Sequence, residues 1–117
     1  MIRTAAVAVL AMVALAVPLR AQDPFYTSLL RRGLADAQQG NWQRAATELR
    51  LAAFGLVDNL PQYETAHVVG AVANERMGHA ADAKVAAEKV VLAERITPSY
   101  ARLPIDAATR SAFEAIL

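Results

Sequence analysis

The sequence predicts an all-α protein, and three observations carry that prediction. Alanine is abundant and β-branched residues are sparse between the prolines, so the intrinsic helix propensity is high. No segment shows the sustained alternation of apolar and polar residues that indicates a half-buried strand. The prolines beyond residue 21 all fall where the apolar period breaks, as expected of a residue that cannot continue a helix: Pro24, Pro61, Pro98 and Pro104.

The first helix should begin at Asp23 and Pro24 and end at Gly40. Aspartate can cap a helix, and proline suits the first turn, where its missing N–H costs nothing. Apolar or small residues recur at helical spacing along this segment. The expected inward positions are Phe25 or Tyr26, Leu29, Leu30, Gly33 and Ala37.

The second helix should open with Asn41 as its cap and end at Gly55 in a left-handed conformation. Residues 58–61 then connect it to the third helix. The inward stripe of the second helix combines one large aromatic residue with several alanines: Trp42, Ala45, Ala46, Leu49, Ala52 and Ala53.

The third and fourth helices should cover residues 61–77 and 80–96, with Gly78 between them. We expect the third helix to be buried on two sides, because valines widen its apolar face. Its face consists of Tyr63, Ala66, His67, Gly70, Ala73 and Met77, widened by Val68, Val69 and Val72. The fourth helix should turn Ala83, Ala87, Val90 and Val91 inward.

A short C-terminal helix should follow Pro104 and Ile105, with Asp106 as its cap. The chain ends in the apolar segment FEAIL, so we expect this helix to dock on the fourth helix or to pair with another chain. Its inward residues should be Ala108, Ala112, Phe113 and Ile116.

The N-terminal 21 residues have the layout of a secretory signal peptide. A short positive start precedes an apolar run over residues 5–17, and Ala21 supplies the small residue at which cleavage is expected. This predicts export to the periplasm or secretion. The alternatives are a retained membrane anchor, for which the run is short, and a buried core helix.

Without those residues the chain has ten basic and eleven acidic side chains, because it loses Arg3 and Arg20. No basic block remains to indicate nucleic acid, and no membrane span is expected in the mature chain. The absence of cysteine excludes disulfides and thiolate chemistry. Three base–acid pairs at i, i+4 spacing should stabilise the helix surfaces slightly: Arg32/Asp36, Arg44/Glu48 and Lys84/Glu88.

Glycine and alanine recur at matching places in two consecutive segments. Gly33 and Gly70 lie inside predicted helices, where each costs about 1 kcal/mol relative to alanine. Each is followed by a glycine at the helix end, Gly40 or Gly78, and then by an alanine five residues on. The sequence therefore predicts two antiparallel helix–turn–helix hairpins over residues 22–96, with a loop and capping helix over residues 97–117.

This arrangement resembles the tetratricopeptide repeat, a two-helix unit of about 34 residues. The first unit is similar at Gly33, Gly40, Trp42, Ala45 and Ala52, and the second at Gly70, Gly78 and Ala83. The second unit has an alanine where the family has its aromatic residue. The resemblance implies that Trp42 fills a wedge between paired helices; a ring exposed for a ligand is the other interpretation. A generic pair of α-hairpins remains the alternative to the family fold.

Candidate catalytic groups are few. Glu64 and His67 form a Glu-x-x-His pair on one helix, the arrangement that di-iron bundles use twice, but the sequence has no second pair and His79 falls in a turn. No serine lies in a nucleophile elbow and no glycine loop for phosphate occurs. The sequence predicts neither an enzyme nor a cofactor. A small helical metalloprotein that uses Glu64 and His67 is a remote alternative.

The resemblance implies a protein–protein interaction module, an adaptor or scaffold without catalytic activity. In that family the first helices of successive units line the groove that holds a peptide or a partner helix. We expect an apolar partner segment, with a basic residue to match the acidic end of the groove. The alternative is a structural homodimer of the cell envelope. By position the groove residues are Thr27, Leu30, Leu34, Gln38, Glu64, His67, Ala71, Asn74 and Glu75.

Overall fold

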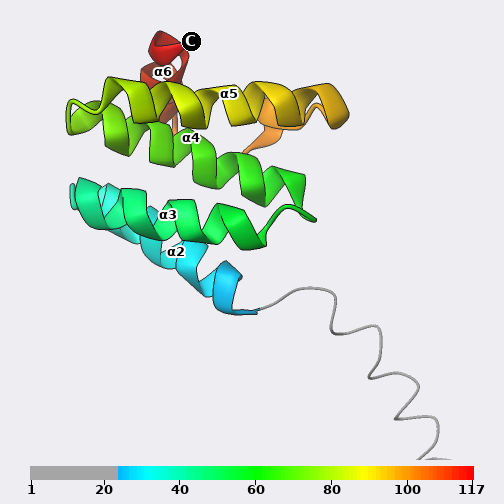
Figure 1. Ribbon diagram of the computed structural model, residues 1–117, viewed down its shortest axis with the longest axis horizontal. Coiled ribbons are helices and arrows are strands. Elements are labelled where there is room, and N and C mark those ends of the chain that lie inside the picture. Colours follow the sequence, from blue (N-terminus) through cyan, green and yellow to red (C-terminus); the bar gives the residue numbers. More distant parts are fainter. Residues whose placement is uncertain (1–23) are drawn as a thin grey trace, which may run out of the picture.

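The computed structural model describes residues 24–117, and the predicted signal peptide lies outside the described residues. This part of the chain is all-α and contains no strand (Figure 1). Helices α2 to α5 stack in chain order, each antiparallel to the one before, and α6 closes one end. None of the described helices is long and apolar enough to cross a bilayer. The helices are α2 (Pro24–Gln38), α3 (Trp42–Gly55), α4 (Leu60–Arg76), α5 (Ala80–Ile96) and α6 (Ala107–Ile116), with a short 3₁₀ helix at Tyr100–Arg102.

The glycine turns that join α2 to α3 and α4 to α5 have the same structure. Gly40 and Gly78 both adopt a positive φ, near 79° and 78°. After each helix, the glycine N–H donates to the carbonyl three residues back, and the next N–H donates to the carbonyl five residues back. This is the Schellman ending, which satisfies the last carbonyls of a helix. The two hairpins therefore contain the same type of turn, at positions 38 residues apart in the chain.

Both ends of α3 lie at the predicted residues, but neither has the predicted capping geometry. Asn41 precedes α3, but its side chain makes no capping hydrogen bond. Gly55 is the last residue of α3 and has no positive φ. A Cβ atom at Gly55 would collide with the ring of Tyr26, so a glycine here lets α2 pack its tyrosine directly onto the α3 backbone.

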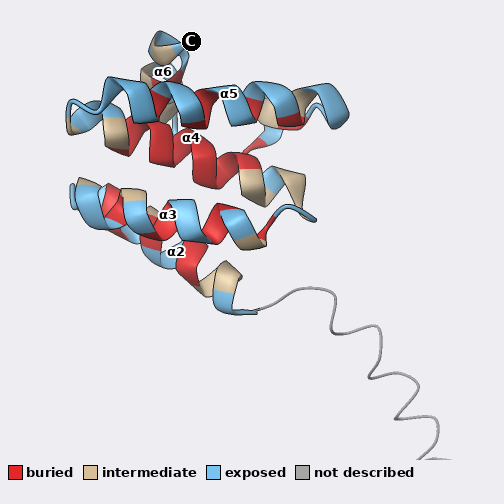
Figure 2. Cartoon of the chain, in the orientation of Figure 1, coloured by how far each residue is buried: buried red, intermediate tan, exposed pale blue. Residues whose placement is uncertain are grey.

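Helix α4 is the centre of the structure, since every residue from 64 to 73 is buried (Figure 2). Its neighbours α3 and α5 are buried on one side only and expose the other. The prediction that this helix is buried on two sides is confirmed. Two hydrophobic clusters cover it, one built with α2 and α3 and the other with α5 and α6.

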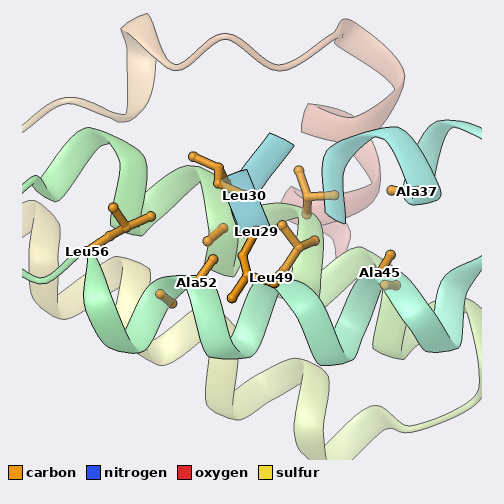
Figure 3. Packing of buried hydrophobic residues seen from close by; sticks show 11 residues of the cluster. Leu29, Leu30, Ala37, Ala45, Leu49, Ala52 and Leu56 are labelled. Carbon is orange, nitrogen blue, oxygen red and sulfur yellow. The ribbon is translucent and has the colours of Figure 1, made fainter. Parts of the chain in front are cut away.

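The first cluster is packed around Leu49 of α3, which is fully buried. Figure 3 shows Leu49 among the leucines of α2, while the alanines of α3 leave room for the neighbouring helices. At Gly33 the approach is tight, because an added Cβ would lie 2.7 Å from Leu49 Cγ and Cδ2. At Gly70 it is not tight, since an added Cβ would meet only Leu49 Cβ, at 3.8 Å.

The second cluster holds α6 in place through Phe113, which is 1% exposed. The ring of Tyr100 lies 5.7 Å from the Phe113 ring, measured between centroids. Helix α6 packs mainly against α4 and less against α5. The expected docking on residues 80–96 is therefore only part of the contact. Ala108 is exposed, contrary to its predicted inward position.

The ion pairs of the first hairpin join α2 to α3. Arg32 lies 3.8 Å from Glu48, and Arg44 lies 3.8 Å from Asp36. The predicted pairs Arg32/Asp36 and Arg44/Glu48, each within one helix, were wrong. The carboxylates of Asp36 and Glu48 lie in the interface between α2 and α3, and each contacts the arginine of the other helix. Burial first, and then the neighbouring Asp36, raise the pKa of Glu48.

The two helical glycines should respond in opposite ways to alanine. Gly33→Ala should lower the free energy of unfolding by about 1–2 kcal/mol, because overpacking against Leu49 outweighs the gain in helix propensity. Gly70→Ala should raise it by up to about 1 kcal/mol, because the added methyl makes only an ordinary contact. Urea denaturation of both variants beside the unchanged chain measures the difference. Equal effects of the two changes would contradict this account of the packing.

Candidate functional site

Two grooves lie on different sides of α4. The α2–α6 groove has a volume of about 340 Å³ and is lined by Leu34, Ala37, Gln38, Trp42, Val69, Val72, Arg76, Pro104, Ile105, Asp106, Ala108 and Thr109. The α3–α5 groove has a volume of about 290 Å³ and is lined by Gln43, Ala46, Thr47, Arg50, Ala66, His67, Gly70, Asn74, Met77, His79, Asp82, Val85, Ala86 and Lys89.

The structure does not bring the predicted partner-binding residues together. Three of them are buried and line neither groove: Leu30, Glu64 and Ala71 are 6%, 0% and 0% exposed. Leu34 and Gln38 line the α2–α6 groove, whereas His67 and Asn74 line the α3–α5 groove. Thr27 and Glu75 line neither groove.

The prediction assigned the wrong face of α4 to the groove beside α2. Val69, Val72 and Arg76 line that groove, and their spacing of three and four residues places them on one face. His67, Gly70 and Asn74 have the same spacing and occupy another face. Apolar residues lie on every side of α4, so the pattern does not tell which face meets which neighbour. Among the residues of these two faces, Arg76 carries the only permanent charge.

Trp42 and Arg76 form one wall of the α2–α6 groove. The Arg76 guanidinium lies 5.8 Å from the centroid of the Trp42 ring, within the range of a cation–π interaction. The indole contacts the first hydrophobic cluster but is only partly buried. Trp42 therefore packs against the helices as expected, and it also presents ring surface to the groove, which a sealed wedge would not do.

The opposite wall of this groove is the segment that leads into α6. Ile105 packs against both hydrophobic clusters. Asp106 caps α6 by accepting a 2.7 Å hydrogen bond from the Thr109 N–H, as predicted. Arg110 lies over the Tyr100 ring, 4.6 Å from its centroid, and donates to the Tyr100 carbonyl at 3.1 Å. These contacts hold residues 103–106 in place between the 3₁₀ helix and α6.

Glu64 belongs to a buried polar cluster between α4 and the end of α5. Its Oε2 accepts a 2.7 Å hydrogen bond from Ser99 Oγ. Glu94 accepts from the backbone N–H groups of Ser99 and Tyr100 at 2.8 and 3.0 Å. The two glutamates thus hold the chain where it leaves α5, and this cluster anchors the segment that ends in α6.

The Glu64 carboxyl is neutral over much of the acid range. Its Oε1 is buried and accepts no hydrogen bond from the described residues. Burial first, and then the hydrogen-bonded Glu94, raise the pKa of Glu64 to about 7. A proton on Glu64 explains both observations, because the protonated oxygen becomes a donor toward the Glu94 carboxylate. The pKa of Glu94 is lowered by its hydrogen bonds with Glu64, Ser99 and Tyr100, which outweigh its burial.

His67 is also buried, at 7% exposure, but its surroundings differ. The Tyr63 ring packs edge-on against it at 4.5 Å between centroids. No hydrogen bond to His67 comes from the described residues. Burial, and next the positive charge of Lys89, lower the pKa of His67 to about 4. The imidazole is therefore neutral at physiological pH.

Glu64 and His67 do not form a metal site with each other. Glu64 is engaged with Ser99 and Glu94, while His67 faces the α3–α5 groove. Within residues 24–117, no three His, Asp or Glu side chains are grouped to hold a metal ion. Comparison of the chain with protein-family models, with curated proteins and with solved structures gives no match.

The protonation of Glu64 predicts a pH-dependent gain from Glu64→Gln. A folded-state pKa near 7, above the ordinary 4.5, means that Glu64 contributes stability below pH 4.5 and that this is lost as the pH rises to 7. Glutamine imitates the protonated acid at every pH. The variant should therefore gain stability relative to the unchanged chain between pH 4.5 and 7, by at most about 3 kcal/mol.

The comparison must be made between the two chains at each pH, by urea denaturation. His67 acts in the opposite direction, because its lowered pKa makes the fold lose stability as the pH falls from 6.5 to about 4. His67 is common to both chains and cancels in their difference. A stability difference that stays constant from pH 4.5 to 8 would show that Glu64 is not protonated in the fold.

Proposed function

We propose that this chain is a protein-interaction module that holds an apolar segment of a partner protein in the α2–α6 groove. The observation that carries the proposal is the accessible Trp42 ring beside Val69 and Val72, with one cation, Arg76, next to it. Aromatic residues and arginine are the side chains most enriched at the energetic centres of protein interfaces. No comparably open aromatic surface lines the α3–α5 groove.

The charges of the groove select a different partner segment from the one that the sequence suggested. The acidic residues expected there, Glu64 and Glu75, do not line it. Arg76 does, and the remaining carboxylate, Asp106, already caps α6. The segment that fits best therefore has an apolar side chain for the space between Leu34 and Val72 and a hydrogen-bond acceptor or carboxylate for Arg76.

The family resemblance remains part of this proposal. The identical glycine turns and the tight contact at Gly33 support a tetratricopeptide-like pair of hairpins. Under that interpretation α2 and α4 are the first helices of the two units, and the groove beside them corresponds to the family's binding surface. Export to the cell envelope, where the chain would act as an adaptor, follows from the N-terminal residues and is proposed with it.

A photo-crosslinking amino acid in place of Gln38, at the exposed rim of the groove, should capture the partner in the native envelope. The same amino acid in place of Lys84, which is exposed on α5 and lines no groove, is the control and should not capture it. Leu34→Glu and Arg76→Glu should each reduce the crosslinked product at least tenfold. The measurement is quantitative mass spectrometry of the crosslinked bands.

Arg76 keeps this test decisive even if Leu34→Glu disturbs the fold. Leu34 is only partly buried but contacts the first cluster, whereas Arg76 is exposed. Circular dichroism should show the same helix content for Arg76→Glu as for the unchanged chain. Equal crosslinking from positions 38 and 84, or capture that survives both groove variants, would rule out the α2–α6 groove as the binding surface.

Self-association is a second candidate function, and the outer face of α5 favours it. Val85, Leu92 and Ile96 are 51%, 56% and 75% exposed, and their spacing of seven and four residues places them in one stripe. In an antiparallel pair of α5 helices centred between Glu88 and Lys89, Val85 meets Leu92 of the second copy and each glutamate meets a lysine. The C-terminal helix is less suited to this role, because Phe113 is already buried in its own chain.

Leu92→Glu distinguishes this second function. If α5 forms a homodimer, light scattering should give twice the monomer mass for the unchanged chain and the monomer mass for Leu92→Glu. Leu51→Glu is the matched control, since Leu51 is equally exposed but lies on α3, and it should leave the dimer intact. A monomeric unchanged chain at high concentration would exclude the dimer.

A further inference from the structure

The α3–α5 groove opens onto a histidine ring that makes no hydrogen bond with the described residues. His67 stands in the middle of α4 and lines the groove, and it accepts or donates no hydrogen bond among the described residues. The edge-on Tyr63 ring holds the imidazole in place. The ring nitrogens of His67 are not among the fully buried side-chain atoms that lack a partner, so they are accessible from the groove. A ligand in the groove can therefore form a hydrogen bond with His67.

The groove has room for a ligand because its floor is made of small residues. Ala46, Ala66, Gly70 and Ala86 line it. Glycine is unfavourable within a helix, and packing does not require it at this position, since an added Cβ would meet only Leu49 at 3.8 Å. Gly33 is different, because Leu49 approaches it too closely for any side chain to fit there. The missing side chain at Gly70 instead deepens the groove beside His67.

The charges around the groove favour an anion. Arg50 on α3 and Lys89 on α5 line it, and neither forms an ion pair with the described residues. The other titratable groups that face it are Asp82 and His79, both exposed near the start of α5. Two permanent cations against one carboxylate leave a positive surplus. The proximity of Lys89 also contributes to the lowered pKa of His67, an effect that a bound anion would offset.

We propose that the α3–α5 groove binds a carboxylate, which accepts a hydrogen bond from His67 and pairs with Lys89, with Arg50 at the opposite rim. The carbon chain of the ligand lies against Val85, Ala86 and Met77, which also line the groove. Phosphate fits less well, because phosphate sites combine several backbone N–H groups at a helix start, whereas the buried donor here is one side chain in mid-helix. This site is separate from the α2–α6 groove and does not depend on the function proposed for it.

The carboxylate can belong to a small organic acid or to an acidic side chain of a protein, and two probes separate these sources. Butyrate has one carboxylate and a short carbon chain. N-acetylglutamate α-amide presents the same carboxylate as a glutamate side chain would, with peptide groups on either side. Tighter binding of butyrate indicates a small acid as the natural ligand, and tighter binding of the glutamate derivative indicates an acidic side chain.

The test is a titration of the folded chain with each probe, followed by nuclear magnetic resonance of the His67 ring nitrogens and the backbone amides. Saturable shifts should concentrate at residues that line the groove. The carboxylate should also raise the pKa of His67 by one unit or more, because it favours the imidazolium form. Butanol and inorganic phosphate are the comparison ligands and should bind at least tenfold more weakly.

Exposed lysines provide matched variants that should not disturb folding. Lys89→Gln should weaken binding of the tighter probe about fivefold or more, since it removes one charge-assisted hydrogen bond. Lys84→Gln removes an exposed charge from the same helix outside the groove and should leave the affinity unchanged. Arg50→Gln should weaken binding to a smaller extent.

Three results would overturn the proposal. The first is the absence of any saturable shift at His67 with either carboxylate. The second is binding of butanol or phosphate as tight as that of butyrate, which would show that the carboxylate is not what the groove recognises. The third is an equal loss of affinity in Lys84→Gln and Lys89→Gln, which would show that general surface charge and not this groove attracts the anion.

Discussion

The burial of the middle of α4 is the constraint on which the rest of the structure depends. Residues 64–73 have no solvent-facing side, so helices must cover α4 in more than one direction. The hairpin of α2 and α3 covers it from one direction, and α5 with α6 covers it from another. A chain of this length buries little apolar surface when it folds, and both hydrophobic clusters are built against α4. The turns, the close contact at Gly33 and the docking of Phe113 all serve to bring these covers onto α4.

Four helices cannot cover a fifth without leaving gaps, and the two grooves are those gaps. The α2–α6 groove lies beside the segment that leads from the 3₁₀ helix into α6, and the α3–α5 groove lies over Gly70. Each groove has a floor from α4 and walls from helices that pack on it. Because the floor is the most buried part of the structure, a ligand in either groove would contact rigid residues and would lose little affinity to ordering the site.

The helices were predictable from the sequence because their boundaries depend on local chemistry. The extent of α5, the Asp106 cap and the glycine turns follow from caps, prolines and left-handed glycines, which act within a few residues. The end of α3 at Gly55 was predicted, but the role of this glycine was not predictable, because it lies in the contact with Tyr26, between residues far apart in the chain. The exchange of partners by Arg32 and Arg44 has the same origin, since it depends on how two helices face each other.

The candidate site was harder to predict than the fold for a physical reason. An amphipathic helix reveals its buried face by its pattern, but apolar residues lie on every side of α4 and polar ones are buried among them, so its pattern does not indicate its orientation. The residues chosen for the groove therefore included three that are buried and line neither groove, Leu30, Glu64 and Ala71. Val69 and Val72, which line the groove, carry no signal that distinguishes them from core valines such as Val68. Only packing decides which valine of a buried helix meets an open groove.

Glu64 and His67 show how burial alone leaves the role of a polar residue undecided. They are three residues apart on the same helix, both are buried, and the pattern Glu-x-x-His suggests one joint site. Their partners separate them. Glu64 accepts a hydrogen bond from the Ser99 hydroxyl and, when protonated, donates one to Glu94. Its partners lie within the fold, so its effect is on stability. His67 has only the edge of the Tyr63 ring and an open groove with two unpaired cations. The ring nitrogens of His67 are accessible from the groove, and this difference is why we assign Glu64 to structure and propose His67 for binding.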